Sequence, residues 1–143
     1  MKENMATISL VLITALVIWR IGFQEGRIEI GPQYTSEQAI DAIIGEASNQ
    51  SFTAMKCIAH GIRNRGTLKG VYGFGAGHNK GETALTRINA QLAWEESEFE
   101  PDPVQGAKEW RGTGDLIPNE FLNEQMIECG DFIFLKPNKT GIK

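Results

Sequence analysis

The chain has 143 residues, enough for one compact domain with a tail or an anchor and hardly enough for two domains. Apolar residues make up 41% and charged residues 22%, as in ordinary globular proteins. The formal net charge is −4 and the pI is about 5.2. Nucleic-acid-binding domains usually carry a basic face and a high pI, so this balance argues against a nucleic-acid partner.

An apolar run near the N-terminus predicts a membrane segment. Residues 5–19 contain no charged side chain, and Arg20 ends the run. As a helix the run would be about 22 Å long, which is short for a bilayer core of about 30 Å. Residues 21–23 extend it if Arg20 turns its charged end toward the interface. No small-residue cleavage site follows, so we expect an uncleaved anchor over residues 1–23, in which residues 5–23 contact the lipid bilayer; a secretory signal peptide is the alternative.

Residues 24–34 contain Gly26, Gly31 and Pro32 and are predicted to be a linker before a domain over residues 35–143. Thr35 and Gln38 have the spacing of a capping box, so a helix is expected to begin there. Ser51 is expected to cap a second helix, which Gly66 ends. Both helices carry apolar residues at helical spacing.

The rest of the domain is predicted from turn residues and periodicity. The glycine-rich residues 66–81 indicate a long loop. A helix follows over about residues 82–95, with Leu85, Ile88 and Leu92 facing inward. A short strand over 107–111, a short helix from Pro118 to about Glu128 and a strand over 132–135 complete the chain. The expected fold is mainly α (α+β), with a small, two-stranded antiparallel element, preceded by a transmembrane helix.

The two cysteines, Cys57 and Cys129, lack metal-ligand spacing, and the two histidines, His60 and His78, do not complete a zinc set. No metal site is therefore expected. The favoured interpretation is that both cysteines are small buried apolar residues. A single disulfide is the alternative, and it gains weight if the domain lies outside the cytoplasm.

Glu46 occupies an unusual place in the first predicted helix. It lies at the edge of the apolar stripe, between Gly45 and Ala47, whose small side chains would let a bulky sugar approach the carboxyl group. A glutamic acid that is partly withdrawn from water and held protonated can donate a proton to a glycosidic oxygen. The pattern alone, however, favours an ordinary solvated glutamate. Four aromatic residues could stack on sugar faces, although core packing is preferred for the third: Tyr72, Phe74, Trp94 and Trp110.

Five short segments are informative as an ordered set. They are AIIGEA at 42–47, IAHGIRNR at 58–65, YGFG at 72–75, Ala93-Trp94 followed by DPVQGA at 102–107, and ECGDFIF at 128–134. Together, over about residues 37–136, they resemble the cell-wall hydrolase family of the spore-cortex-lytic enzymes. The first segment matches the family's catalytic-glutamate helix, so the resemblance makes Glu46 the candidate catalytic residue.

The resemblance implies a lysozyme-like helical core, as in lytic transglycosylases and goose-type lysozymes. It implies cleavage of the bond between N-acetylmuramic acid and N-acetylglucosamine of peptidoglycan by one glutamate, acting first as acid and then as base, without a metal or organic cofactor. Two positions depart from the family pattern: Asp131 stands where a histidine is usual, and Gly75 where a serine is usual. The expected substrate-binding residues are Asn64, Tyr72, Phe74, Trp94, Asp102, Gly106, Ala107, Trp110 and Asp131.

We expect a lytic transglycosylase, because no second carboxylate is marked by spacing as a hydrolase would require. Candidates for such a carboxylate are Glu82, Asp102, Glu109 and Asp131. The alternatives are a hydrolytic muramidase, used by a phage for cell entry or lysis, and a non-catalytic, membrane-anchored peptidoglycan-binding or virion structural protein. The domain is expected outside the cytoplasm, in the periplasm or cell envelope, or on a virion membrane.

Overall fold

The computed structural model describes residues 32–75, 82–121 and 124–136. The chain divides into two units, residues 1–30 and 31–143, and the described residues all belong to the second. The predicted anchor, most of the predicted linker and His78 lie outside the described residues, and the predicted domain boundaries stay predictions. Within the described ranges, no helix has the length and apolar character needed to cross a membrane.

The first two described helices begin where the sequence predicts. In α2 (Ser36–Ala47), the Thr35 hydroxyl accepts a hydrogen bond from the Gln38 N–H at 3.2 Å. The Gln38 side chain accepts one from the Thr35 N–H at 2.9 Å, which completes the capping box. Ser51 caps α3 (Phe52–Arg65), and Gly66 ends it in the left-handed conformation, with φ 68°.

The glycine-rich segment was predicted to be a loop throughout, and this is only partly correct. It contains a one-turn helix, α4 (Tyr72–Gly75), which packs against α2. Residues 76–81 lie outside the described residues. The backbone of this turn lies directly on α2, because neither Gly73 of α4 nor Gly45 of α2 carries a side chain; this tertiary contact is not revealed by local sequence.

The helix α5 (Ala84–Glu96) was predicted, but its buried face was predicted wrongly. Leu85, Ile88 and Leu92 are exposed, at 66%, 53% and 43%. The buried side chains are instead Ala90, Ala93 and Trp94. These three residues also lie at helical spacing. Because the two alanines are small, α5 can approach α2 and α3 closely, and the stripe that contains them faces the core.

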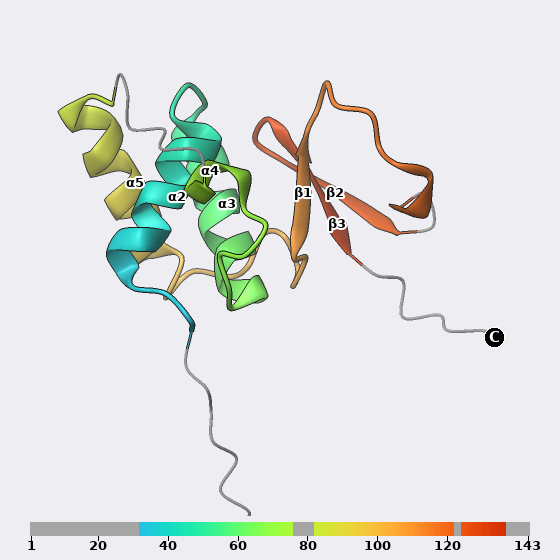
Figure 1. Ribbon diagram of the computed structural model, residues 1–143, viewed down its shortest axis with the longest axis horizontal. Helices are drawn as coiled ribbons and strands as arrows, with labels where there is room; N and C mark the ends of the chain where they lie inside the picture. The colour runs from blue at the N-terminus through green and yellow to red at the C-terminus, as the bar shows by residue number, and fades with distance from the viewer. Residues whose placement is uncertain (1–31, 76–81, 122–123, 137–143) are drawn as a thin grey trace, which may run out of the picture. The chain divides into compact units, whose positions relative to one another are not determined.

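The β element has three strands rather than the predicted two (Figure 1). Strand β3 (Phe132–Lys136) lies between β1 (Glu109–Gly112) and β2 (Gln125–Cys129), and both pairings are antiparallel. The helix predicted to run from Pro118 to about Glu128 is only a 3-10 turn, η1 (Asn119–Phe121). Residues 125–129 pair with β3 instead, and this pairing overrides their local helical pattern.

Helix α3 connects the parts of the domain, because it contacts α2, α5, β1 and β2. Figure 1 shows the helices gathered together and the strands forming a separate small sheet. The core of the domain is apolar. Its largest fully buried side chains include Ile43, Ile44, Ile58, Ile62, Val104, Phe134 and Leu135.

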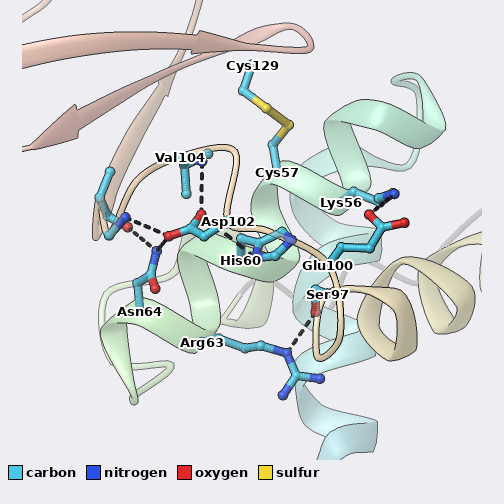
Figure 2. Close-up of polar contacts among 12 residues, drawn as sticks. Lys56, Cys57, His60, Arg63, Asn64, Ser97, Glu100, Asp102, Val104 and Cys129 are labelled. Carbon is cyan, nitrogen blue, oxygen red and sulfur yellow. Dashed lines mark hydrogen bonds and ion pairs between the residues drawn. A yellow bond between two sulfur atoms is a disulfide. The ribbon is translucent and has the colours of Figure 1, made fainter.

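Cys57 of α3 and Cys129 of β2 form a disulfide, so the favoured interpretation of two separate buried cysteines is wrong (Figure 2). Their Cα atoms are 6.0 Å apart, within the usual range for a disulfide. The sequence could not reveal the pairing, because it arises only when β2 folds back beside α3. The bond therefore fixes the sheet to the central helix.

Removing this disulfide is expected to lower the free energy of unfolding by about 4 kcal/mol, because it closes a loop with a sequence separation of 72. The measurement is denaturant unfolding of the full-length chain with and without a reducing agent. A Cys57→Ser/Cys129→Ser variant is the control and should match the reduced protein. Equal stability of the oxidised, reduced and double-variant proteins would contradict the pairing.

Candidate active site

The carboxyl group of Glu46 is held by donors from two different elements. One oxygen accepts a hydrogen bond from the backbone N–H of Gly73 in α4, at 2.6 Å. The other accepts one from the indole Nε1–H of Trp110 in β1, at 3.1 Å. The side chain is half-buried. Glu46 is therefore a fixed, partly desolvated carboxyl group rather than a freely moving surface glutamate.

The Gly73 donor reaches Glu46 because two glycines let α2 and α4 touch backbone to backbone. A Cβ placed on Gly45 would lie 2.3 Å from the Gly73 carbonyl oxygen, and one on Gly73 would lie 2.6 Å from the Glu46 nitrogen. Neither position has room for a side chain. The expectation that Gly45 leaves space for a sugar is therefore wrong, since the α4 backbone fills that space.

Trp110 is brought to Glu46 by the packing of the sheet on α3. Its ring is 8% exposed and packs on Phe134, with ring centroids 5.9 Å apart. Gly61 of α3 faces these two rings, and a Cβ there would lie 3.0 Å from each of them. The absence of a side chain at Gly61 lets the indole lie close to α3, with its N–H directed at Glu46.

Glu46 lines an open pocket of about 290 Å³, part of which is open solvent. Two of the predicted site residues, Tyr72 and Trp110, share this pocket with Glu46. Sequence reasoning named Glu109 only as a candidate second carboxylate, and it missed the two arginines that line the pocket, Arg65 and Arg111. Among these, only Arg65 carried a signal, since it lies in one of the five segments. The other lining residues are Gly70 and Val71.

Asn64 and Asp102, both predicted to bind substrate, hydrogen-bond to each other at 3.0 Å (Figure 2). Asp102 also accepts hydrogen bonds from the backbone N–H groups of Val104 and Gly106, at 2.9 and 2.6 Å. Asn64 also donates to the Ala107 carbonyl at 3.2 Å. These contacts fix the turn that leads into β1, and none of these residues lines the Glu46 pocket.

His60 is buried beside this turn, with its Nδ1 3.7 Å from an oxygen of Asp102. Burial lowers the pKa of His60, and the nearby Asp102 carboxylate only partly opposes this effect. Burial tends to raise the pKa of Asp102, but hydrogen bonds from Asn64, Gly106 and Val104 lower it overall. A neutral His60 thus faces a charged Asp102 near neutral pH.

The remaining predicted residues lie elsewhere. Trp94 is 8% exposed, with the Arg63 guanidinium 3.8 Å from its ring centre and Tyr34 packed edge-on against it. Phe74 is 41% exposed on α4. Asp131 is exposed between β2 and β3. None of the three lines the pocket, and their proposed contacts with substrate stay predictions. The described part of the chain contains no group of His, Cys, Asp or Glu residues that could hold a metal ion.

The fold is similar to that of two solved structures. The catalytic domain of the Bacillus cereus SleB protein has a TM-score of 0.57 and 21% identity, over 78% of this chain and 99% of that domain. The catalytic domain of SleB from Bacillus anthracis, described as a germination-specific lytic transglycosylase, has a TM-score of 0.53 and 19% identity, over 75% and 100%. At these identities the likeness establishes the fold. No protein-family model matches the chain, and no curated protein does.

The contact between α2 and α4 gives a prediction for Gly45→Ala. In an unobstructed helix this change would stabilise the protein slightly. Here the new methyl group would overlap the Gly73 backbone, so we expect unfolding to become easier by about 1–3 kcal/mol, measured by denaturant unfolding. Gly114→Ala is the control: no neighbour lies within 4 Å, and a change within about 0.5 kcal/mol is expected. Equal effects at the two positions would contradict the contact.

Buried His60 gives a prediction for pH. Because its pKa is lower in the folded protein than the ordinary 6.5, the unfolded chain takes up the proton first as pH falls. The stability that depends on neutral His60 is complete above pH 6.5 and is lost as pH falls toward the lower, folded pKa. We expect the free energy of unfolding to depend less on pH between 7 and 5 in His60→Gln. The measurement is denaturant unfolding at several pH values, and an unchanged slope in His60→Gln would contradict a buried, neutral His60.

Proposed function

We propose that the chain is a peptidoglycan-cleaving enzyme, a lytic transglycosylase that breaks the bond between N-acetylmuramic acid and N-acetylglucosamine. Glu46 is its acid and its base. The observation that carries this proposal is the half-buried Glu46 carboxyl group, held by two fixed N–H donors at the wall of an open pocket. The likeness in fold to a domain described as a lytic transglycosylase supports it.

In the proposed reaction, protonated Glu46 donates its proton to the glycosidic oxygen as the bond to the anomeric carbon breaks. The 6-hydroxyl oxygen of the same muramic acid then attacks that carbon, and its proton passes to the Glu46 carboxylate. The products are a strand ending in a 1,6-anhydro ring and a strand with a free hydroxyl. No water is consumed, and Glu46 ends protonated. The Gly73 and Trp110 donors keep the carboxyl group in place and stabilise the intervening carboxylate.

The surroundings of Glu109, the candidate second carboxylate that lines the pocket, favour this route over hydrolysis. A glycoside hydrolase generally needs a second carboxylate to activate water or to form a covalent intermediate. Glu109 lines the pocket, but it pairs with Arg65 at 2.7 Å. A hydrolytic muramidase, with Glu109 positioning the water, is the alternative. The other sequence candidates do not line the pocket: Glu82, Asp102 and Asp131.

Tyr72 is the side chain best placed to hold a sugar. It is 76% exposed and lines the Glu46 pocket, so its ring offers a flat surface on which a glycan can stack. Phe74, on the same turn of helix, is the second candidate for such a contact. We propose that the glycan strand runs along α4 and places its scissile bond beside Glu46.

We further propose that the domain acts outside the cytoplasm, attached to a bilayer by residues 5–23. The disulfide between Cys57 and Cys129 supports this location, because disulfides persist in oxidising compartments and are rare in the cytosol. Peptidoglycan, the proposed substrate, also lies outside the cytoplasm. A role in phage entry or lysis would use the same chemistry and is a question of origin rather than of mechanism.

Glu46→Gln is expected to lower the rate of peptidoglycan cleavage by at least about 100-fold, because glutamine cannot donate or accept the proton. The full-length chain and its variant would be incubated with purified sacculi, and the soluble products analysed by mass spectrometry. Wild-type products one water lighter than hydrolytic fragments would identify the anhydro ring. Glu128→Gln, on an exposed part of β2, is the control and should behave as wild type.

Three other outcomes would decide against parts of the proposal. Hydrated products that disappear in Glu109→Gln would favour the muramidase. Full activity of Glu46→Gln would exclude Glu46 as the acid and base. Binding to sacculi without soluble products from any protein would leave a non-catalytic peptidoglycan-binding protein.

A further inference from the structure

Arg65, the last residue of α3, lies between the two elements that hold Glu46. One of its terminal nitrogens, Nη2, donates to the Lys69 carbonyl at 2.7 Å. The other, Nη1, donates to the Lys108 carbonyl at 3.1 Å and to the Glu109 carboxylate at 2.7 Å. Its side chain is 14% exposed. The guanidinium thus joins the loop after α3 to the start of β1.

Each of these segments leads directly to one of the donors. The loop that contains Lys69 continues into α4, whose Gly73 N–H binds Glu46. Lys108 and Glu109 immediately precede Trp110, whose indole binds the other oxygen of Glu46. Direct contact between α4 and β1 is not extensive.

We propose that Arg65 is a positioning residue, which sets the spacing between the Gly73 and Trp110 donors and so fixes the orientation of the Glu46 carboxyl group. The planar guanidinium has donors in a rigid fork, so it can bind the loop and the strand at a set distance. Its carbon is also 5.7 Å from the centre of the Trp110 ring, which adds a cation–π contact to the same indole. The catalytic consequence rests on the proposed function; the structural one does not.

Arg63 provides a matched control within the same helix. Its Nε donates to the Ser97 hydroxyl at 2.7 Å and its Nη2 to the Trp94 carbonyl at 2.8 Å. Its guanidinium also lies on a tryptophan ring, 3.8 Å from the centre of Trp94. Arg63 therefore makes contacts of the same kinds as Arg65, but it does not line the Glu46 pocket.

The test compares Arg65→Lys with Arg63→Lys in the full-length chain, held in detergent micelles. Lysine keeps the charge but cannot bridge two segments with a planar fork. The first measurement is the position of the Trp110 indole N–H signal in a ¹H–¹⁵N spectrum, assigned as the signal that Trp110→Phe removes. The second is kcat and KM on soluble glycan strands. The third is thermal stability.

We expect Arg65→Lys to shift the Trp110 signal and to lower kcat by about 10- to 100-fold with little change in KM, as for a misplaced catalytic group. Arg63→Lys should lower stability similarly, yet leave the Trp110 signal and kcat unchanged. If Arg65→Lys does not fold, Glu109→Gln is the second variant. It keeps an acceptor but removes the ion pair, and it should move the Trp110 signal in the same direction by a smaller amount.

An unmoved Trp110 signal in the Arg65→Lys protein would overturn the proposal. So would a raised KM with unchanged kcat, which would instead make Arg65 a substrate-binding residue. Equal effects of both arginine variants would reduce Arg65 to a general structural role. A shifted Trp110 signal in a chain whose Glu46→Gln variant is fully active would support the positioning role while rejecting the proposed function.

Discussion

The backbone contact between Gly45 and Gly73 is the constraint on which the candidate site depends. A carboxyl group on a helix surface normally points into water and moves freely. Here the carboxyl group belongs to Glu46, the residue after Gly45, and the contact brings the backbone N–H of Gly73 to it. A backbone donor cannot change its rotamer, so its direction is set by the crossing of α2 and α4. The two glycines thus convert a local feature of one helix into a site with fixed geometry.

The second donor depends on long-range packing. Trp110 belongs to the sheet, and its indole reaches Glu46 only because Gly61 leaves room on α3 and Phe134 supports the ring. The turn fixed by Asn64 and Asp102 delivers the chain from α5 to β1 in the required direction. Neither the helices nor the sheet alone would hold both oxygens of the carboxyl group. The site is therefore a property of the assembled domain.

Much of the helical part could be predicted, because its signals are local. The caps at Thr35 and Ser51 and the stop at Gly66 depend on residues within one turn, and the structure confirms them. The prediction of the buried face of α5 was wrong, because that helix carries two apolar stripes. Only tertiary packing decides which of the two stripes is buried. Strand β2 was predicted as part of a helix, because its pairing with β3 cannot be recognised from the local sequence of β2.

The candidate site was predictable only in part, for a similar reason. Glu46 and Tyr72 belong to segments that resemble the spore-cortex-lytic enzymes, and both residues line the pocket. Glu109 and Arg111 carry no local signal, since an ordinary charged residue becomes part of a pocket only through the path of the chain. Asn64 and Asp102 lie in the resembling segments, yet their visible contacts are with each other and with the turn. A motif can therefore mark a residue that supports a site as readily as one that lines it.

The link between Cys57 and Cys129 also governs how the domain opens. Proteins open locally in cooperative units, and a small hairpin at the edge of a domain is the kind of unit that detaches first. The covalent bond holds β2, and through its pairing β3 and β1, to the central helix. The sheet then cannot peel away while the helices stay folded. A protease that cleaves only detached strands would therefore have no substrate until the domain opens as a whole.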